Sequence, residues 1–120
     1  MSIKALRGAV QLKADDRQEM LEAVKEVLQQ MMQKNNLAVS DLISVIFTST
    51  PDLVSEFPAV AARELGMGEI PLMCSVEINV PGALPRVVRV MMHASTGLTT
   101  SEIKHIYIRG AEVLRRDLAQ

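Results

Sequence analysis

The sequence is poor in residue types on which several protein classes depend. It contains two Phe, one Tyr and no Trp, which is too few for the aromatic platforms that stack nucleic-acid bases. Its single cysteine, Cys74, excludes an internal disulfide and fits a reducing compartment. It also lacks an excess of charge of either sign, with 13 basic against 14 acidic residues. A broad electrostatic surface for DNA or RNA is therefore not expected.

Long apolar runs are absent as well. No stretch approaches the ~20 apolar residues that span a bilayer, and the first ten residues show no apolar core of a signal peptide. We therefore expect a soluble, cytoplasmic protein without membrane or nucleic-acid partners. Apolar residues still make up 48% of the 120 residues, enough for one domain over 1–120 with its own core.

The spacing of apolar residues predicts the order of the elements. A stripe at helical spacing predicts a helix over 17–34, with Asp16 and Glu19 as a capping box, and Pro58 begins a second helix over 58–65. Strands are expected over 3–12, 43–48, 72–80 and 86–93, a polar loop over 94–102, and short extended pieces over 106–108 and 111–114. This order indicates an α/β or α+β domain with one mixed sheet. With helices on one side, the other apolar face needs a cover, which favours a homo-oligomer.

Arg89 is the most informative residue, because it interrupts an apolar strand. A buried cation must meet an anion, since an isolated charge inside a protein is costly. One interpretation is an internal ion pair with Glu77 on the neighbouring strand. The other is a site for an anionic or electron-rich ligand atom.

Other arginines extend this second interpretation. Arg7 lies in the middle of a strand beside Gly8, where a missing side chain lets a ligand or another backbone approach, although an arginine in water at the sheet edge is equally compatible. Arg63, Arg115 and Arg116 are typical of surface positions. Several arginines with few matching buried carboxylates favour a small anion such as a carboxylate or phosphate. No glycine-rich phosphate loop occurs.

Other chemistries find little support in the residues. His93 and His105 have no Cys or carboxylate at metal-ligand spacing, so no metal is expected. No GxSxG motif marks a serine nucleophile, and without a phosphate-binding loop no cofactor is expected either. Cys74 is most simply a small buried apolar residue. The pattern indicates binding, or a reaction driven by positioning and electrostatics alone.

Four segments carry a specific resemblance that covers nearly the whole chain. They are LRGAV at 6–10, TSTPDLVSEFPAVAARELG at 48–66, PLMCSVEINVPGALPRVVRVMMH at 71–93 and IKHIYIRGAEVLRRDL at 103–118. In this order they resemble the monofunctional, trimeric chorismate mutases of the AroH type. The resemblance implies conversion of chorismate to prephenate without cofactor, and a trimeric pseudo-α/β barrel with active sites between subunits.

The resemblance also implies roles for single residues. Arg89 matches the arginine that hydrogen-bonds the ether oxygen of the breaking bond, and Arg7 and Tyr107 match groups that hold carboxylates. Glu77 and Cys74 match residues that contact the ring hydroxyl. The remaining substrate contacts implied are a wall from the neighbouring subunit, an apolar lining and a closing tail: Phe57, Ala59, Arg63, Leu72, Met73, Leu114 and Arg115.

Some features depart from that pattern. Cys74 and Glu77 are an odd number of residues apart, which in a regular strand places them on opposite faces. Either the strand is bulged or one of them lies outside the site. Val60 stands where some relatives carry a charge, and Arg116 where the family often has proline. A rival of another class is a non-catalytic trimeric module that binds small anions, or a small-molecule deaminase of similar architecture.

Overall fold

The elements follow the predicted order closely. The computed structural model describes residues 1–115. Its strands and helices are β1 (Ser2–Gln11), α1 (Arg17–Lys34), β2 (Leu42–Ser49), α2 (Pro58–Glu64), β3 (Leu72–Val76), β4 (Val87–Thr96) and β5 (Ile106–Ile108). Three short 3-10 helices cover Val39–Asp41, Thr100–Glu102 and Ala111–Leu114.

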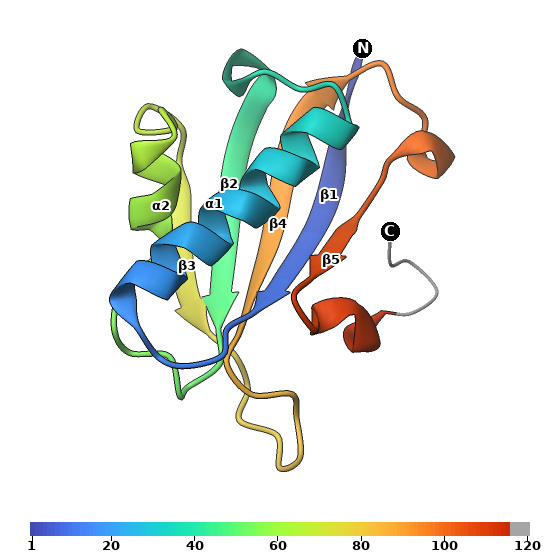
Figure 1. Ribbon diagram of the computed structural model, residues 1–120. Helices are drawn as coiled ribbons and strands as arrows, with labels where there is room; N and C mark the ends of the chain where they lie inside the picture. The colour runs from blue at the N-terminus through green and yellow to red at the C-terminus, as the bar shows by residue number, and fades with distance from the viewer. Residues whose placement is uncertain (116–120) are drawn as a thin grey trace.

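The strands form one mixed sheet in the order β3-β2-β4-β1-β5 (Figure 1). β4 is antiparallel to both β1 and β2, whereas β3 runs parallel to β2 and β5 parallel to β1. The parallel pair β2–β3 needs a crossover connection, which α2 provides. The predicted fold class, one mixed sheet with two helices, is confirmed.

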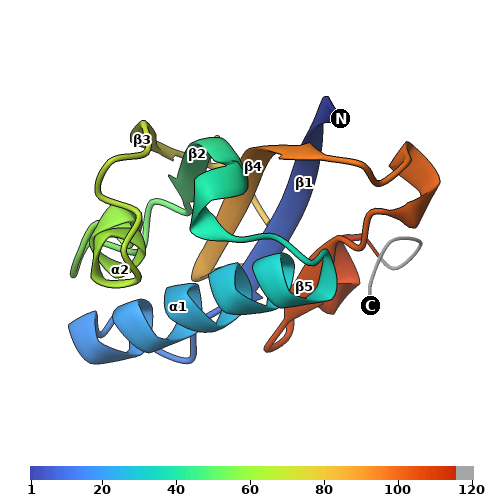
Figure 2. The same cartoon turned by 90° about the horizontal axis from the view of Figure 1, so that it is seen from above.

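Both helices cover the same face of the sheet (Figure 2). α1 begins as predicted, because the Asp16 carboxylate accepts a hydrogen bond from the Glu19 backbone N–H at 2.8 Å. Its apolar stripe, including Met20, Val24 and Met31, is fully buried in the main core. In the described part of the chain, no helix is both long and apolar enough to cross a membrane.

The opposite face of the sheet carries neither α1 nor α2. The turn at Ala111–Leu114 packs on it beside Ala9 and Tyr107, and elsewhere this face keeps apolar side chains exposed. Ile3, Ile46, Met73 and Met91 all retain a third or more of their accessible surface. Alternation along the strands places them on this side, which we call the open face. The predicted uncovered apolar face is therefore present in the single chain.

Three local predictions are wrong. β3 ends at Val76 instead of residue 80, because β2 ends at Ser49 and offers no further partner. β4 continues to Thr96, where a loop was expected, because it pairs with the start of β1 as far as Ser2. Residues 111–114 form a 3-10 turn after Gly110, whose φ of 105° redirects the chain.

Gly8 also has a role other than the predicted one. It faces α1, and a Cβ at this position would lie 2.5 Å from the Met31 sulfur. Its missing side chain therefore admits the helix to the sheet, and it does so on the side away from the open face.

Candidate active site

The register of the sheet brings the predicted polar residues together on the open face. Arg89 of β4 lies opposite Ala9 of β1 and Thr48 of β2, and Ala9 in turn lies opposite Tyr107 of β5. Arg7 lies opposite Met91, two residues along the strands from the Ala9–Arg89 pair and on the same face of the sheet. Four strands distant in sequence thus contribute to one area.

Glu77 holds Arg89 in this area. Its Oε1 lies 2.7 Å from the Arg89 Nε and also accepts a hydrogen bond from the Thr48 hydroxyl at 3.0 Å. The Glu77 backbone N–H donates to the Ser49 carbonyl at 2.8 Å, which anchors the segment just after β3. The predicted ion pair is confirmed, but it is not buried, because the Arg89 side chain remains 48% exposed on the open face. The ion pair uses the Nε–H, which leaves the other N–H donors of the guanidinium for other partners.

Arg7 is fixed through its backbone by His105. The Arg7 N–H donates to the His105 Nδ1 at 2.9 Å, which requires that ring nitrogen to be unprotonated. Burial lowers the pKa of His105 below its ordinary 6.5, and the cations of Arg7 and Arg115 lower it further. The neutral ring that this bond needs is thus the form that the surroundings favour.

These residues surround a hollow of about 440 Å³. We call it the Arg89 hollow, and its lining is Arg7, Gly8, Ile46, Thr48, Glu77, Arg89, Val90, Met91 and Tyr107. Two guanidinium groups against one carboxylate leave an excess positive charge, and Ile46 and Met91 form an apolar floor. Such a hollow suits a small anion with an apolar body.

Cys74 and Phe57 line a different hollow. β3 pairs with β2 without a bulge, so Cys74 lies opposite Phe47 and packs toward the helices, whereas Glu77 reaches the open face. The second hollow, about 450 Å³, is formed by 49–51, 53–58 and 74–76, and we call it the Phe57 hollow. Of the two explanations for the odd spacing of Cys74 and Glu77, a bulge in the strand is wrong. In one chain, Cys74 and Glu77 do not share a site.

The other predicted contacts are spread over the molecule. Ala59 is buried in the main core, Val60 and Leu72 pack partly against it, and Arg63 is exposed on α2. Met73 is exposed on the open face. Leu114 packs on the small cluster around Tyr107 and Ala111, and Arg115 is half-buried near His105. Arg116 lies outside the described residues.

Sequence reasoning missed several groups at the Arg89 hollow. Thr48, Ile46 and Met91 share its face because of the strand register, which the sequence does not reveal. The alternation of side chains along a strand does predict that Thr48 lies on the same face as Ile46. The sequence gives no sign that His105 supports Arg7, because the bond joins residues far apart in the chain. The described residues contain no group of three His, Cys, Asp or Glu placed to hold a metal ion.

Comparison with known proteins identifies relatives of this chain along nearly its full length. The family model "Chorismate mutase type I" matches residues 3–118. "Chorismate mutase AroH" of Thermus thermophilus is 40% identical over 117 residues, covering 97% of this chain and 96% of the relative. Its namesake in Bacillus subtilis is 36% identical over 120 residues, covering 99% and 94%.

A solved structure is similar as well. The chorismate mutase from Clostridium thermocellum superposes with a TM-score of 0.90 at 44% identity, covering 92% of this chain and 98% of that one. The chain belongs to the chorismate mutase type I family. The family resemblance expected from the four sequence segments is confirmed.

Proposed function

We propose that this protein is a chorismate mutase, which rearranges chorismate to prephenate in aromatic amino-acid biosynthesis. Beyond the family membership, the supporting observation is the Arg89 hollow, where Arg7, Arg89 and Tyr107 surround a space of about 440 Å³. Chorismate is a dianion, and the excess positive charge of this hollow matches it. The deaminase and the non-catalytic module lose support, because the full-length relatives carry the name chorismate mutase.

The chemistry needs no covalent step from the protein. In the rearrangement the ether C–O bond breaks as a new C–C bond forms, and negative charge grows on the ether oxygen. The Arg89 guanidinium, held by Glu77, stabilises that charge more in the transition state than in the ground state. Arg7 and Tyr107 hold the carboxylates, so that the two carbons to be joined approach each other.

We further propose that the active site is completed between copies of the chain. Cys74 and Phe57 lie in one hollow, and Glu77 and Arg89 lie in the other. A second copy on the open face would bring its Phe57 hollow to the Arg89 hollow of the first. It would also cover exposed side chains such as Met73 and Ile46. A homotrimer closes this contact with three equivalent sites.

Some features stay predictions on this basis. The exposed Arg63 and the half-buried Leu114 and Arg115 line the substrate, the last as part of a closing tail. A single domain over 1–120 and a cytoplasmic location also stay predictions.

Loss of chorismate absorbance on adding the purified protein tests the activity directly. We expect acceleration over the rate in buffer alone, with stoichiometric prephenate as product. A rate equal to that of buffer, for protein shown by light scattering to be a folded trimer, would refute the activity. A folded, active monomer would refute the shared site and leave the activity standing.

A further inference from the structure

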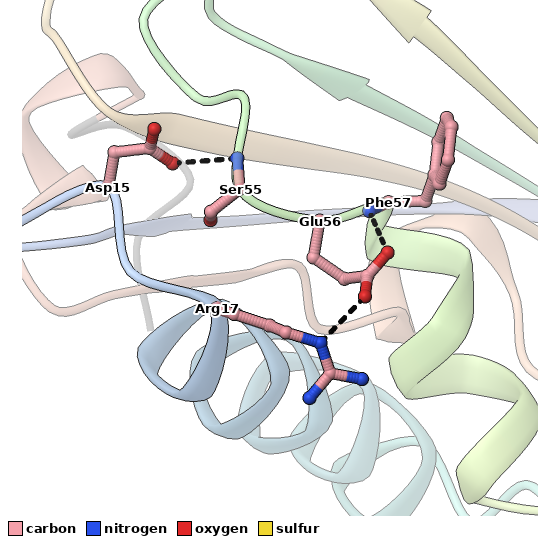
Figure 3. Close-up of polar contacts among 5 residues, drawn as sticks. All are labelled: Asp15, Arg17, Ser55, Glu56 and Phe57. Carbon is pink, nitrogen blue, oxygen red and sulfur yellow. Dashed lines mark hydrogen bonds and ion pairs between the residues drawn. The ribbon is translucent and has the colours of Figure 1, made fainter.

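The loop that carries Phe57 is tied to the start of α1 by two carboxylates. We call residues 50–57, between β2 and α2, the Phe57 loop. The Asp15 carboxylate accepts a hydrogen bond from the backbone N–H of Ser55 at 3.0 Å (Figure 3). It accepts a second one from the backbone N–H of Val54 at 3.1 Å. It comes from the segment just before α1, so two points distant in sequence are fastened together.

Glu56 makes the second tie. One of its oxygens accepts the backbone N–H of Phe57 at 2.9 Å, and the other lies 2.8 Å from the Nε of Arg17, in the first turn of α1. The Glu56 side chain is only 18% exposed, whereas Arg17 is 58% exposed. Glu56 thus connects the helix α1 to the peptide group from which the Phe57 side chain extends.

The charges support these ties. The pKa of Glu56 lies below its ordinary 4.5, first because of the Phe57 N–H and then because of Arg17. The pKa of Asp15 is lowered as well, by the Ser55 side chain and then by the two backbone N–H groups. Both carboxylates are therefore ionised acceptors at neutral pH, the form that makes the stronger hydrogen bonds.

Phe57 itself has little to hold it. Its ring is 68% exposed and points away from Arg17 and Glu56 (Figure 3). It stands at the N-cap of α2, where it offers no side-chain cap. An exposed aromatic ring without packing of its own takes its position from its backbone, and here that backbone is fixed by Glu56.

We propose that Arg17 is a positioning residue for the reaction: through Glu56 it holds the Phe57 ring in the place where it forms a wall of the neighbouring copy's Arg89 hollow. This inference rests on the proposed function and deepens it. Arg17 does not touch substrate. Arg17 sets the fraction of molecules in which the Phe57 loop is placed for substrate binding. The apparent dissociation constant of the substrate varies inversely with that fraction.

The expected signature is therefore in KM. Arg17→Ala should raise KM about threefold to tenfold and leave kcat within about twofold, since Arg89 is undisturbed. Arg17→Lys keeps a cation at the position and should recover much of the loss.

Lys25→Ala is the matched control. Lys25 lies on the same helix and pairs with Glu64 of α2 at 2.6 Å, so it too ties α1 to another segment by a partly exposed ion pair. That pair bears on the far end of α2 and not on the Phe57 loop. A purely structural role for Arg17 predicts equal effects of the two substitutions on KM, and that result would overturn the proposal.

A double-mutant cycle tests whether the effect passes through Phe57. In a Phe57→Leu background, Arg17→Ala should raise KM further by less than about twofold, because the ring that Arg17 positions is absent. A full additional increase would show that Arg17 acts elsewhere and would reject the inference.

Failure of the inference and failure of the proposed function are distinguishable. If the unchanged protein has no activity, the function fails. If it is active and Arg17→Ala, at unchanged thermal stability and trimer content, has the KM of the parent, only the positioning role fails.

Discussion

At the residue scale, the Arg89–Glu77–Thr48 arrangement shows what a strand register adds to a sequence. The sequence allows two interpretations of Arg89, an ion pair with Glu77 or a ligand site. In the structure, Arg89 pairs with Glu77 and also lines a hollow. The two interpretations seemed to compete only because the strand looked buried on both faces. Exposure of the open face in the single chain removes that conflict.

Arg89→Ala should lower kcat about 100-fold or more while changing KM far less, because the guanidinium acts mainly on charge that develops in the transition state. Arg89→Met, which keeps an unbranched apolar stem but removes the guanidinium, should behave the same way. Steady-state kinetics with chorismate would measure both variants. An unchanged kcat in a folded variant would contradict the role of Arg89.

His105 makes a second prediction, in the pH dependence of stability. Its pKa is lower in the folded chain than its ordinary 6.5, so the unfolded state takes up a proton first as pH falls. The free energy of unfolding should therefore be highest above about pH 7 and decrease as the pH falls below 6.5. The decrease should stop once the pH is below the pKa of His105 in the folded state. His105→Asn keeps an acceptor for the Arg7 N–H but does not titrate.

Urea unfolding at pH 7.5 and pH 5.5 would test this. The decrease in unfolding free energy between the two pH values should be smaller in His105→Asn than in the parent. An equal decrease in both proteins would assign the pH dependence to other groups.

At the scale of elements, periodicity predicted α1 over Arg17–Lys34 and the order of the four long strands and two helices. It failed at ends, where pairing and not propensity decides. β3 stops where β2 stops, and β4 runs on because β1 begins early. The residues of β3 and β4 alone therefore do not show where either strand ends.

Gly8 provides the prediction at this scale. Gly8→Val should cost about 1–3 kcal/mol of stability, because the added atoms meet Met31 and Val27 of α1 in a filled core. Gly97→Val is the matched control, since nothing lies within 4 Å of a Cβ at that glycine. Thermal and urea unfolding would measure both, and equal stability of the two variants would show that α1 adjusts without cost.

At the scale of the whole molecule, the two hollows explain why the candidate site was only partly predictable. The resemblance named residues of both hollows as one site, and the structure of a single chain separates them. What joins them is the proposed contact between copies, and neither periodicity nor the charge pattern specifies how copies meet.

Mixing two defective variants tests that contact. Arg89→Ala damages the Arg89 hollow, and Phe57→Asp places an anion in the wall facing a dianionic substrate. If each site takes one hollow from each of two copies, unfolding and refolding the two variants together should restore about a quarter of the sites. Recovered activity well above the sum of the separate variants is the expected result. Activity equal to that sum, in mixed trimers confirmed by mass, would place the whole site within one chain.

The odd spacing of Cys74 and Glu77 has a consequence for the assembled enzyme. In the proposed trimer these two residues, three positions apart on one segment, belong to two different active sites. In each copy, the segment that runs from β3 to Glu77 then contributes to two sites. A ligand that shifts β3 by a fraction of an ångström would reshape the neighbouring site directly, without a relay of side chains. In that trimer, the affinities of successive substrate molecules would therefore report how strongly neighbouring sites are coupled.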